Sequence, residues 1–188
     1  MRLIAFLLSL GLMAPTVFAE TIKLKAKSKW ISEAPVEKIV GSAQGKASLS
    51  ITGVDFGTLK GDIVIPVASM KSGNDMRDEH LRGAEWLEAD KHPNITFTIE
   101  SVTVGEQNDK GQKVKVAGKI TIHGVTQALN ADAEIKMIEK GGKKKVKIKT
   151  KFIVELGQFN IAGKKGVVGN KVGEKIDVST TLVGEIVQ

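Results

Sequence analysis

Apolar and polar residues alternate along most of the chain. From Thr21 to Trp30 every second residue is apolar or small, and lysines fill the positions between them. The same pattern recurs in segments 46–51, 59–67, 95–101, 114–122 and 176–186. A segment with one apolar and one polar face is typical of a strand in an antiparallel sheet with one solvated side. The pattern therefore predicts an all-β protein.

One hairpin can be placed in register from its residues. A two-residue turn at Gly141-Gly142 sets Ile135 opposite Ile148 and Glu134 opposite Lys149. The same register gives the pairs Met137–Val146, Ala133–Thr150, Ala131–Phe152 and Asp132–Lys151. A slip of one residue would destroy both the apolar and the charged pairs. We therefore interpret the basic run 143–151 as the solvent-facing side of a strand rather than as a polyanion site.

Residues 69–93 interrupt the alternation. Asn74 or Asp75 can cap a helix there, Gly83 can divide it into two pieces, and Pro93 prevents its continuation. The residues that recur at helical spacing are Met76, His80, Leu81, Ala84 and Leu87. Regularly spaced strands with one helical connection favour a barrel or sandwich over a parallel α/β sheet. We predict a mainly antiparallel barrel of about eight strands, with the helical connection as a lid or plug.

The first nineteen residues have the layout of a secretory signal peptide. Arg2 precedes an apolar run of eleven residues from Leu3 to Met13, and Pro15, Val17 and Ala19 follow. This run is too short to span a bilayer. Cleavage after Ala19 would leave residues 20–188 as one domain and predicts a periplasmic location. An uncleaved anchor or a buried core helix is the alternative interpretation.

Composition narrows the classes of function. The chain of 188 residues has no cysteine, which excludes a disulfide scaffold, a thiol nucleophile and a cysteine-ligated metal. Its net charge of +7 allows an approach to anionic membrane surfaces, although lysines that simply solvate strand faces explain the charge as well. Nucleic acid is not an expected partner in the periplasm.

No catalytic arrangement is evident in the sequence. His80, His92 and His123 form no His-Glu-x-x-His motif, and the chain has no Gly-x-Ser-x-Gly elbow. The glycine-rich segment 163–173 lacks phosphate-loop spacing, and His123-Gly124 is interpreted as turn chemistry. We therefore predict a protein that is not an enzyme and has no catalytic residues, no metal site and no cofactor.

Several segments together resemble the YceI-like family. They are Met76–Arg82, Trp86–Ala89, His92–Phe97 and Val116–Thr126, with Phe152–Ile161 and Val172–Ile176 similar to its closing strands. The resemblance covers nearly all of residues 20–188 in the family's order. It implies an exported, lipocalin-like barrel that holds a polyisoprenoid, a fatty acid or a fatty amide in its lumen, as a carrier or a sequestering protein.

Candidate ligand contacts follow from the strand faces and the resemblance. The predicted lumen residues are Trp30, Ile63, Ile65, Phe97, Ile99, Val116, Ile120, Ile135, Ile148, Phe152 and Phe159. The predicted lid lies in Met76–Ala89, with His80, Leu81, Trp86 and Leu87 at the mouth and the loop Gly157–Gly173 as the other rim.

Several alternatives remain open from sequence alone. The lid could be a gate or a fixed plug, and for His80 a core position is favoured over a pH-sensitive latch. The protein could instead be a ligand-free module that docks through its lysine face, or a lipid or amide hydrolase. A homodimer is also left open.

Overall fold

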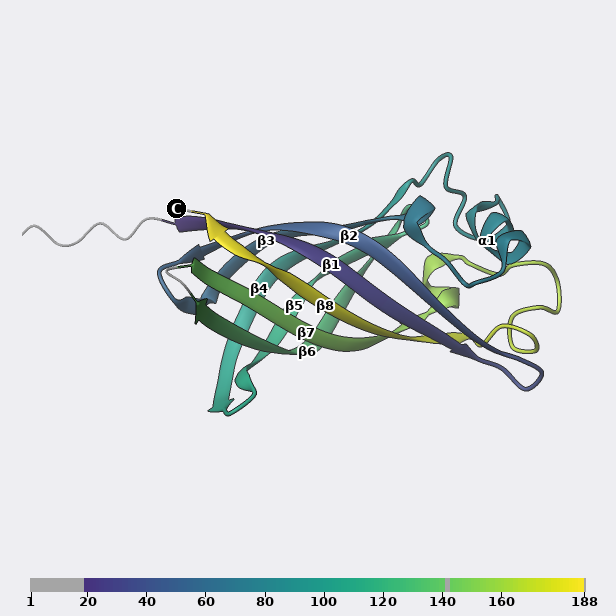
Figure 1. Cartoon of the computed structure of the whole chain (residues 1–188). Coiled ribbons are helices and arrows are strands. Elements are labelled where there is room, and N and C mark those ends of the chain that lie inside the picture. Colours follow the sequence, from purple (N-terminus) through teal and green to yellow (C-terminus); the bar gives the residue numbers. More distant parts are fainter. Residues whose placement is uncertain (1–18, 141–142, 188) are drawn as a thin grey trace, which may run out of the picture.

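The computed structural model describes residues 19–140 and 143–187, and within them the chain forms a closed eight-stranded barrel (Figure 1). The strands are β1 (Ala19–Glu33), β2 (Lys38–Thr52), β3 (Asp55–Pro66), β4 (Asn94–Asn108), β5 (Gly111–Ile122), β6 (Val125–Lys140), β7 (Lys143–Glu155) and β8 (Lys175–Val187). Each strand pairs antiparallel with the next, and β8 returns to pair with β1. The predicted fold class is confirmed.

The predicted hairpin register is confirmed over most of its length. Ile135 pairs with Ile148 and Glu134 with Lys149, in a ladder that runs from Asp132–Lys151 to Lys140–Lys143. The predicted pair of Ala131 with Phe152 lies one position beyond this ladder. The turn residues 141 and 142 lie outside the described residues. Apolar pairing on one face and opposite charges on the other therefore specify this register correctly.

Two clusters of buried side chains make up the core. One lies near the start of β1 and includes Ile22, Leu24, Leu49, Ile135 and Leu182. The other lies toward the end of the barrel that carries the long connections, and includes Val67, Leu87, Ile122, Leu156 and Phe159. Because side chains of a strand alternate between its two faces, the strands contribute mainly alternate residues to these clusters. The alternation shifts at the irregularity of β4 between Ile99 and Ser101, so both Ile99 and Val102 face the core.

The connection between β3 and β4 contains a 3₁₀ turn, η1 (Val67–Ser69), and the helix α1 (Asp75–Arg82). The side chain of Asn74 caps α1 by accepting a hydrogen bond from the backbone N–H of Arg77 at 3.0 Å. Gly83 ends the helix, as predicted. The prediction of a second helical piece after Gly83 was wrong. Residues 84–91 form turns instead, in which Glu88 has a left-handed φ of 45°.

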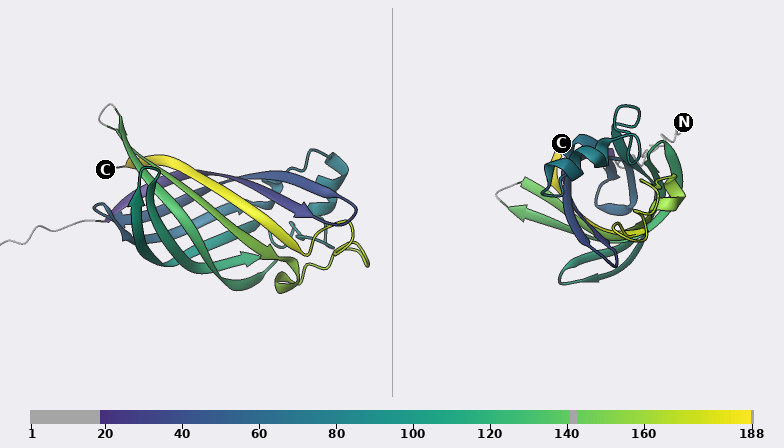
Figure 2. Two further views of the ribbon diagram at one scale, coloured as in Figure 1. Left: turned by 90° about the horizontal axis from the view of Figure 1, so that it is seen from below. Right: turned by 90° about the vertical axis from the view of Figure 1, so that its right-hand side faces the viewer.

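Both long connections lie at the same end of the barrel. The end-on view in Figure 2 places α1 on one side of the opening, and on another side the loop that follows η2 (Leu156–Phe159). The barrel end with these two segments is called the mouth below. The predicted signal peptide falls almost wholly on residues outside the described ranges. Among the described helices, none has the length and apolar character needed to cross a membrane.

Candidate functional site

The barrel encloses a cavity of about 500 Å³. This volume falls within the range of about 300–1,000 Å³ that is typical of small-molecule sites. All eight strands contribute to its wall, and most of the lining side chains are apolar. Several are small, such as Ala43, Ala131 and Ala133, so inward-facing side chains leave the interior partly unfilled.

Ten of the eleven predicted lumen residues line this cavity. They are Trp30, Ile63, Ile65, Phe97, Ile99, Val116, Ile120, Ile135, Ile148 and Phe152. The strand alternation therefore identifies the wall, while contact between these residues and a ligand stays a prediction.

Phe159 is the exception among the predicted lumen residues. It is only 2% exposed but packs in the core cluster at the mouth rather than on the cavity wall. The prediction was wrong because Phe159 ends the 3₁₀ turn η2, where the two-residue period of a strand no longer sets the direction of a side chain.

The few polar groups on the wall are mostly paired. The hydroxyls of Ser28 and Thr180 are hydrogen-bonded at 2.8 Å, and Ser32 Oγ accepts a hydrogen bond from the backbone N–H of Gly173 at 2.8 Å. Trp30 Nε1 is buried and has no hydrogen-bond partner within the described residues. The wall thus offers an apolar ligand a surface with few competing polar groups.

The predicted lid residues lie at the mouth. His80, Leu81, Trp86 and Leu87 all line the cavity there, and Leu87 is buried. His80 is exposed on α1, so the interpretation of this residue as a core histidine was wrong. Its helical spacing indicated an inward side chain, but the helix is short and lies over the opening rather than within the core.

The other predicted rim, the loop 157–173, closes against the lid segment. Val167, Lys171 and Val172 of this loop line the cavity. The Trp86 indole lies so close to Gly163 that a Cβ atom at residue 163 would be 2.7 Å from a ring carbon. Lid and loop are therefore in direct contact across the mouth.

Two polar contacts attach α1 to the rest of the mouth. Arg77 Nη2 lies 2.6 Å from Glu37 Oε1, in the connection between β1 and β2. The next residue, Asp78, is 1% exposed and accepts hydrogen bonds from the backbone N–H and the hydroxyl of Ser72 at 2.6 and 2.7 Å. Lys71 Nζ lies 3.7 Å from the same carboxylate.

The surroundings of Asp78 favour its charged form. The Ser72 hydroxyl bond, against the opposing effect of burial, holds the pKa of Asp78 below its ordinary value of 3.8, and the Ser72 amide and Lys71 act in the same direction. Sequence reasoning missed this role, because an acid in the first turn of a helix is ordinarily a solvent-exposed partner of the helix dipole.

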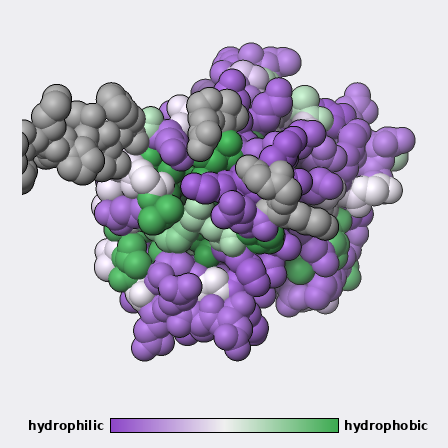
Figure 3. Space-filling view, turned by 60° about the vertical axis from the view of Figure 1, so that its left-hand side comes forward, coloured by the Kyte–Doolittle hydropathy of each residue, from purple (hydrophilic) through white to green (hydrophobic). Residues whose placement is uncertain are grey.

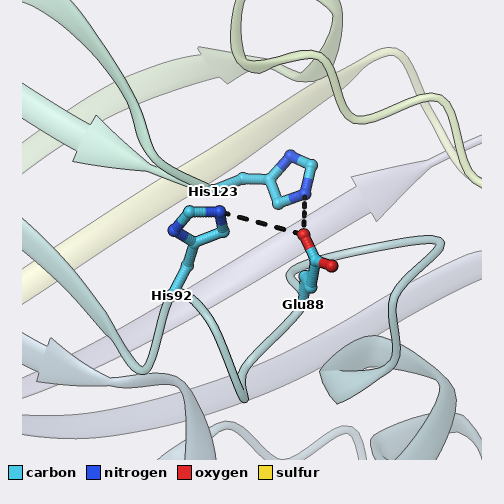
Figure 4. Close-up of side chains that lie close together, drawn as sticks. All are labelled: Glu88, His92 and His123. Carbon is cyan, nitrogen blue, oxygen red and sulfur yellow. Dashed lines mark ion pairs between the residues drawn. The ribbon is translucent and has the colours of Figure 1, made fainter.

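A polar cluster lies beside the mouth, where the connection after α1 meets the turn between β5 and β6. Glu88, His92 and His123 point toward one another there (Figure 4). Lys91 Nζ lies 2.7 Å from Glu88 Oε1, and mainly this hydrogen bond holds the pKa of Glu88 below its ordinary value. The prediction of no metal site did not anticipate this arrangement. The spacing of Glu88 and His92, four residues apart, was the available signal.

The outer surface of the barrel is mostly hydrophilic, as Figure 3 shows for one side. The side chains of Lys23, Lys25, Lys27 and Lys29 on β1 are exposed. On β7, Lys143, Lys145, Lys149 and Lys151 alternate with the buried Val146 and Ile148 and are exposed, and Glu185 of β8 pairs with Lys143 and Lys145 at 3.8 and 3.4 Å. These lysines therefore solvate the outside of the strands.

Comparison with known proteins gives consistent matches. The YceI-like domain family matches residues 20–183. The protein YceI of Shigella flexneri is 30% identical over 123 residues, which are 63% of this chain and 61% of that protein. The match thus spans about three fifths of the length of such curated relatives.

Two solved structures share the fold at low sequence identity. Burkholderia cenocepacia BcnA has a TM-score of 0.69 at 19% identity, covering 84% of this chain and 95% of that one. A polyisoprenoid binding domain from Saccharophagus degradans has a TM-score of 0.66 at 14% identity, covering 88% and 98%.

Proposed function

Because the chain belongs to the YceI-like domain family, we propose that it binds a long-chain apolar molecule in the lumen of its barrel. A polyisoprenoid, a fatty acid or a fatty amide has the required chemistry. The solved polyisoprenoid binding domain from S. degradans has the same fold and supports this class of ligand. In this proposal the protein acts as a carrier or sequestering protein.

The observation that carries the proposal is the cavity of about 500 Å³ with its apolar wall. Each methylene group removed from water contributes about 0.8 kcal/mol, so a chain of ~15 carbons would gain roughly 12 kcal/mol. Ordering the ligand and the mouth costs several kcal/mol of this gain. The remainder, about 8 kcal/mol, corresponds to a dissociation constant near 1 μM.

The same wall supports binding rather than catalysis. A serine or threonine nucleophile needs an adjacent base to remove its proton. The hydroxyls of Ser28 and Thr180 bond to each other, and the Thr150 hydroxyl donates to the backbone carbonyl of Asp132 at 2.9 Å. Within the described residues, none of these hydroxyls is hydrogen-bonded to a histidine. A role without covalent chemistry therefore fits the cavity best.

The proposal places the protein in the periplasm. The leader-like sequence of the first nineteen residues supports export, and the lysines on β1 and β7 would favour contact with an anionic membrane surface, where such ligands reside.

A docking module without a ligand is the competing proposal, since the same lysines could bind a partner. A homodimer is compatible with either.

Native mass spectrometry of the protein purified from its own host tests the proposal. We expect a co-purifying hydrophobic mass that leaves on delipidation and is replaced by a fluorescent fatty-acyl or polyprenyl probe. Ala131→Phe, which fills the lumen, should weaken probe binding at least ~10-fold, a change of about 1.4 kcal/mol. Val183→Phe is the matched control, because Val183 is 44% exposed on the outer face of β8.

Three results would overturn the proposal. Equal probe binding by the two variants would place the probe outside the lumen. A protein that carries no ligand and takes up no probe, but binds a partner in a salt-sensitive manner, would favour the docking module. Turnover of ester or amide substrates would favour a hydrolase.

A further inference from the structure

Three side chains that could bind a metal ion converge outside the lumen. Glu88 and His92 lie in the connection after α1, and His123 lies in the turn between β5 and β6, as Figure 4 shows. One potential ligand atom from each residue lies within 4.8 Å of the other two. Segments some thirty residues apart thus contribute to one polar cluster.

The spacing within the cluster is too long for hydrogen bonds. Glu88 Oε2 lies 3.7 Å from His123 Nε2 and 3.8 Å from His92 Nε2. Ligand atoms around a tetrahedral zinc ion, with bonds of about 2.0–2.1 Å, lie about 3.4 Å apart. A contraction of a few tenths of an ångström would bring both histidine nitrogens to this separation from the carboxylate oxygen.

The far side of His123 is held in the manner of a metal ligand. Its Nδ1 lies 3.2 Å from the backbone carbonyl oxygen of Phe159. A carbonyl oxygen can only accept, so this contact requires the proton on Nδ1 and leaves the lone pair of a neutral imidazole on Nε2. That lone pair faces the Glu88 carboxylate, and either a proton on Nε2 or a metal ion between the two atoms would remove their repulsion. A hydrogen bond of this kind commonly orients histidine ligands.

The other two side chains are also held in position. Lys91 occupies Glu88 Oε1 at 2.7 Å, which leaves Oε2 directed at the histidines. The His92 ring packs against Gly124, where a Cβ atom would lie 2.5 Å from a ring carbon. Glu88 and His123 both have a left-handed backbone, with φ of 45° and 51°. Such strain in residues other than glycine is often found at functional sites.

We propose that Glu88, His92 and His123 bind one divalent transition-metal ion of the zinc class. Two imidazoles and one carboxylate suit Zn²⁺ and leave at least one coordination position open. The side chains are 17–31% exposed, so water or a small ligand could reach that position. The ion would link the barrel wall to the connection after α1, which covers the mouth. This role is independent of the ligand in the lumen.

Metal binding to the purified mature chain, expressed without a polyhistidine tag and treated with a chelator, tests this proposal. Titration with Co²⁺ should produce the visible absorption of a four- or five-coordinate ion, saturating at one ion per chain. Competition with a chromophoric chelator then measures the Zn²⁺ affinity. His92→Ala and His123→Ala should each lower this affinity by about 100-fold or more, since loss of only an outer-shell partner already costs about 10–100-fold.

His80→Ala is the matched control, because His80 lies on α1 and is not part of the cluster. NMR of the imidazole groups in the unmodified chain provides a second measurement that does not depend on folded variants. On addition of Zn²⁺, the resonances of His92 and His123 should shift while those of His80 do not. Absence of stoichiometric binding, equal affinity in all three variants, or a shift confined to His80 would overturn the proposal.

Discussion

Gly41 lies directly opposite Trp30 in the ladder between β1 and β2, and the indole covers the glycine. A Cβ atom at residue 41 would lie 2.0 Å from a carbon of the ring. An aromatic side chain that packs over a cross-strand glycine lies against the sheet rather than across the space in front of it. The missing side chain of Gly41 therefore helps to keep the lumen open beside Trp30.

Gly41→Ala should push the Trp30 indole away from the wall and into the cavity. We expect the barrel to remain folded, with probe affinity lowered by about 10-fold, or 1.4 kcal/mol. Fluorescence of Trp30, one of two tryptophans in the chain, should change together with the affinity. Gly157→Ala is a suitable control, because nothing lies within 4 Å of a Cβ atom there. Unchanged affinity in Gly41→Ala would mean that the indole position does not limit the lumen.

Ile148→Asp should destabilise the barrel severely. Ile148 is 6% exposed and lines the cavity, so the new carboxylate would be buried without a partner. We expect a loss of about 4 kcal/mol or more in the free energy of unfolding. The control is Ile153→Asp on the outer face of the same strand, where the side chain is 53% exposed and the change should be within about 0.5 kcal/mol. Equal denaturation midpoints for both variants would refute the assignment of the two faces.

The strands and their faces could be predicted because a single physical rule determines both. Alternation places Ile135 and Ile148 on one face, and the charge pair of Glu134 with Lys149 then fixes the register. The closure of β8 onto β1 was not predicted in register, since it joins residues far apart in the sequence, such as Ser28 and Thr180. Pairing between strands so far apart in the chain leaves no pattern in the sequence next to either strand.

The mouth was less predictable than the wall. Asp78, in the first turn of α1, is buried because Ser72 and Lys71 fold back onto it. The spacing of apolar residues in the sequence does not predict such a contact. The Glu88 cluster depends likewise on a turn that brings in His123 from another hairpin. Side chains on irregular segments take their directions from tertiary packing, so sequence reasoning placed Phe159 wrongly on the lumen wall. His80 lies at the mouth as predicted, although its side chain is exposed rather than part of the core.

Asp78→Asn should weaken the attachment of α1 in a pH-dependent manner. Because the folded-state pKa of Asp78 lies below the ordinary value of 3.8, ionisation of this carboxyl stabilises the fold above that pH. The stabilisation is lost as the pH falls through the lowered pKa. At pH 7 the variant should lose about 1–3 kcal/mol, the cost of weakening hydrogen bonds to a buried charged group.

Thermal unfolding at several pH values checks this expectation. The difference between the unmodified chain and Asp78→Asn should be constant near neutral pH and shrink below pH 3.8. Asp75→Asn is the control, since Asp75 lies exposed in the same turn of the helix. A difference that does not vary with pH would show that the charge of Asp78 plays no part in holding the helix.

Trp86→Ala should accelerate the exit of a ligand if the lid is a gate. The segment before α1 is fixed to β2 by two backbone hydrogen bonds between Ser42 and Lys71, of 2.7 and 2.8 Å. Trp86 lies beyond Gly83 and reaches across the mouth to Gly163, so its removal frees the far end of the lid without touching a strand. Opening a strand instead would break many ladder hydrogen bonds at once.

Stopped-flow displacement of a fluorescent fatty-acyl or polyprenyl probe measures the exit rate of the ligand. Loss of the indole contacts, worth about 1.4 kcal/mol, corresponds to release about 10-fold faster, with a melting temperature only about 3–6 °C lower. Val104→Ala, at a residue 44% exposed in the part of β4 that pairs with Val114, controls for the loss of an apolar side chain elsewhere. If Trp86→Ala and Val104→Ala release the probe at the same rate, the lid is a fixed plug, and ligands enter and leave by another route.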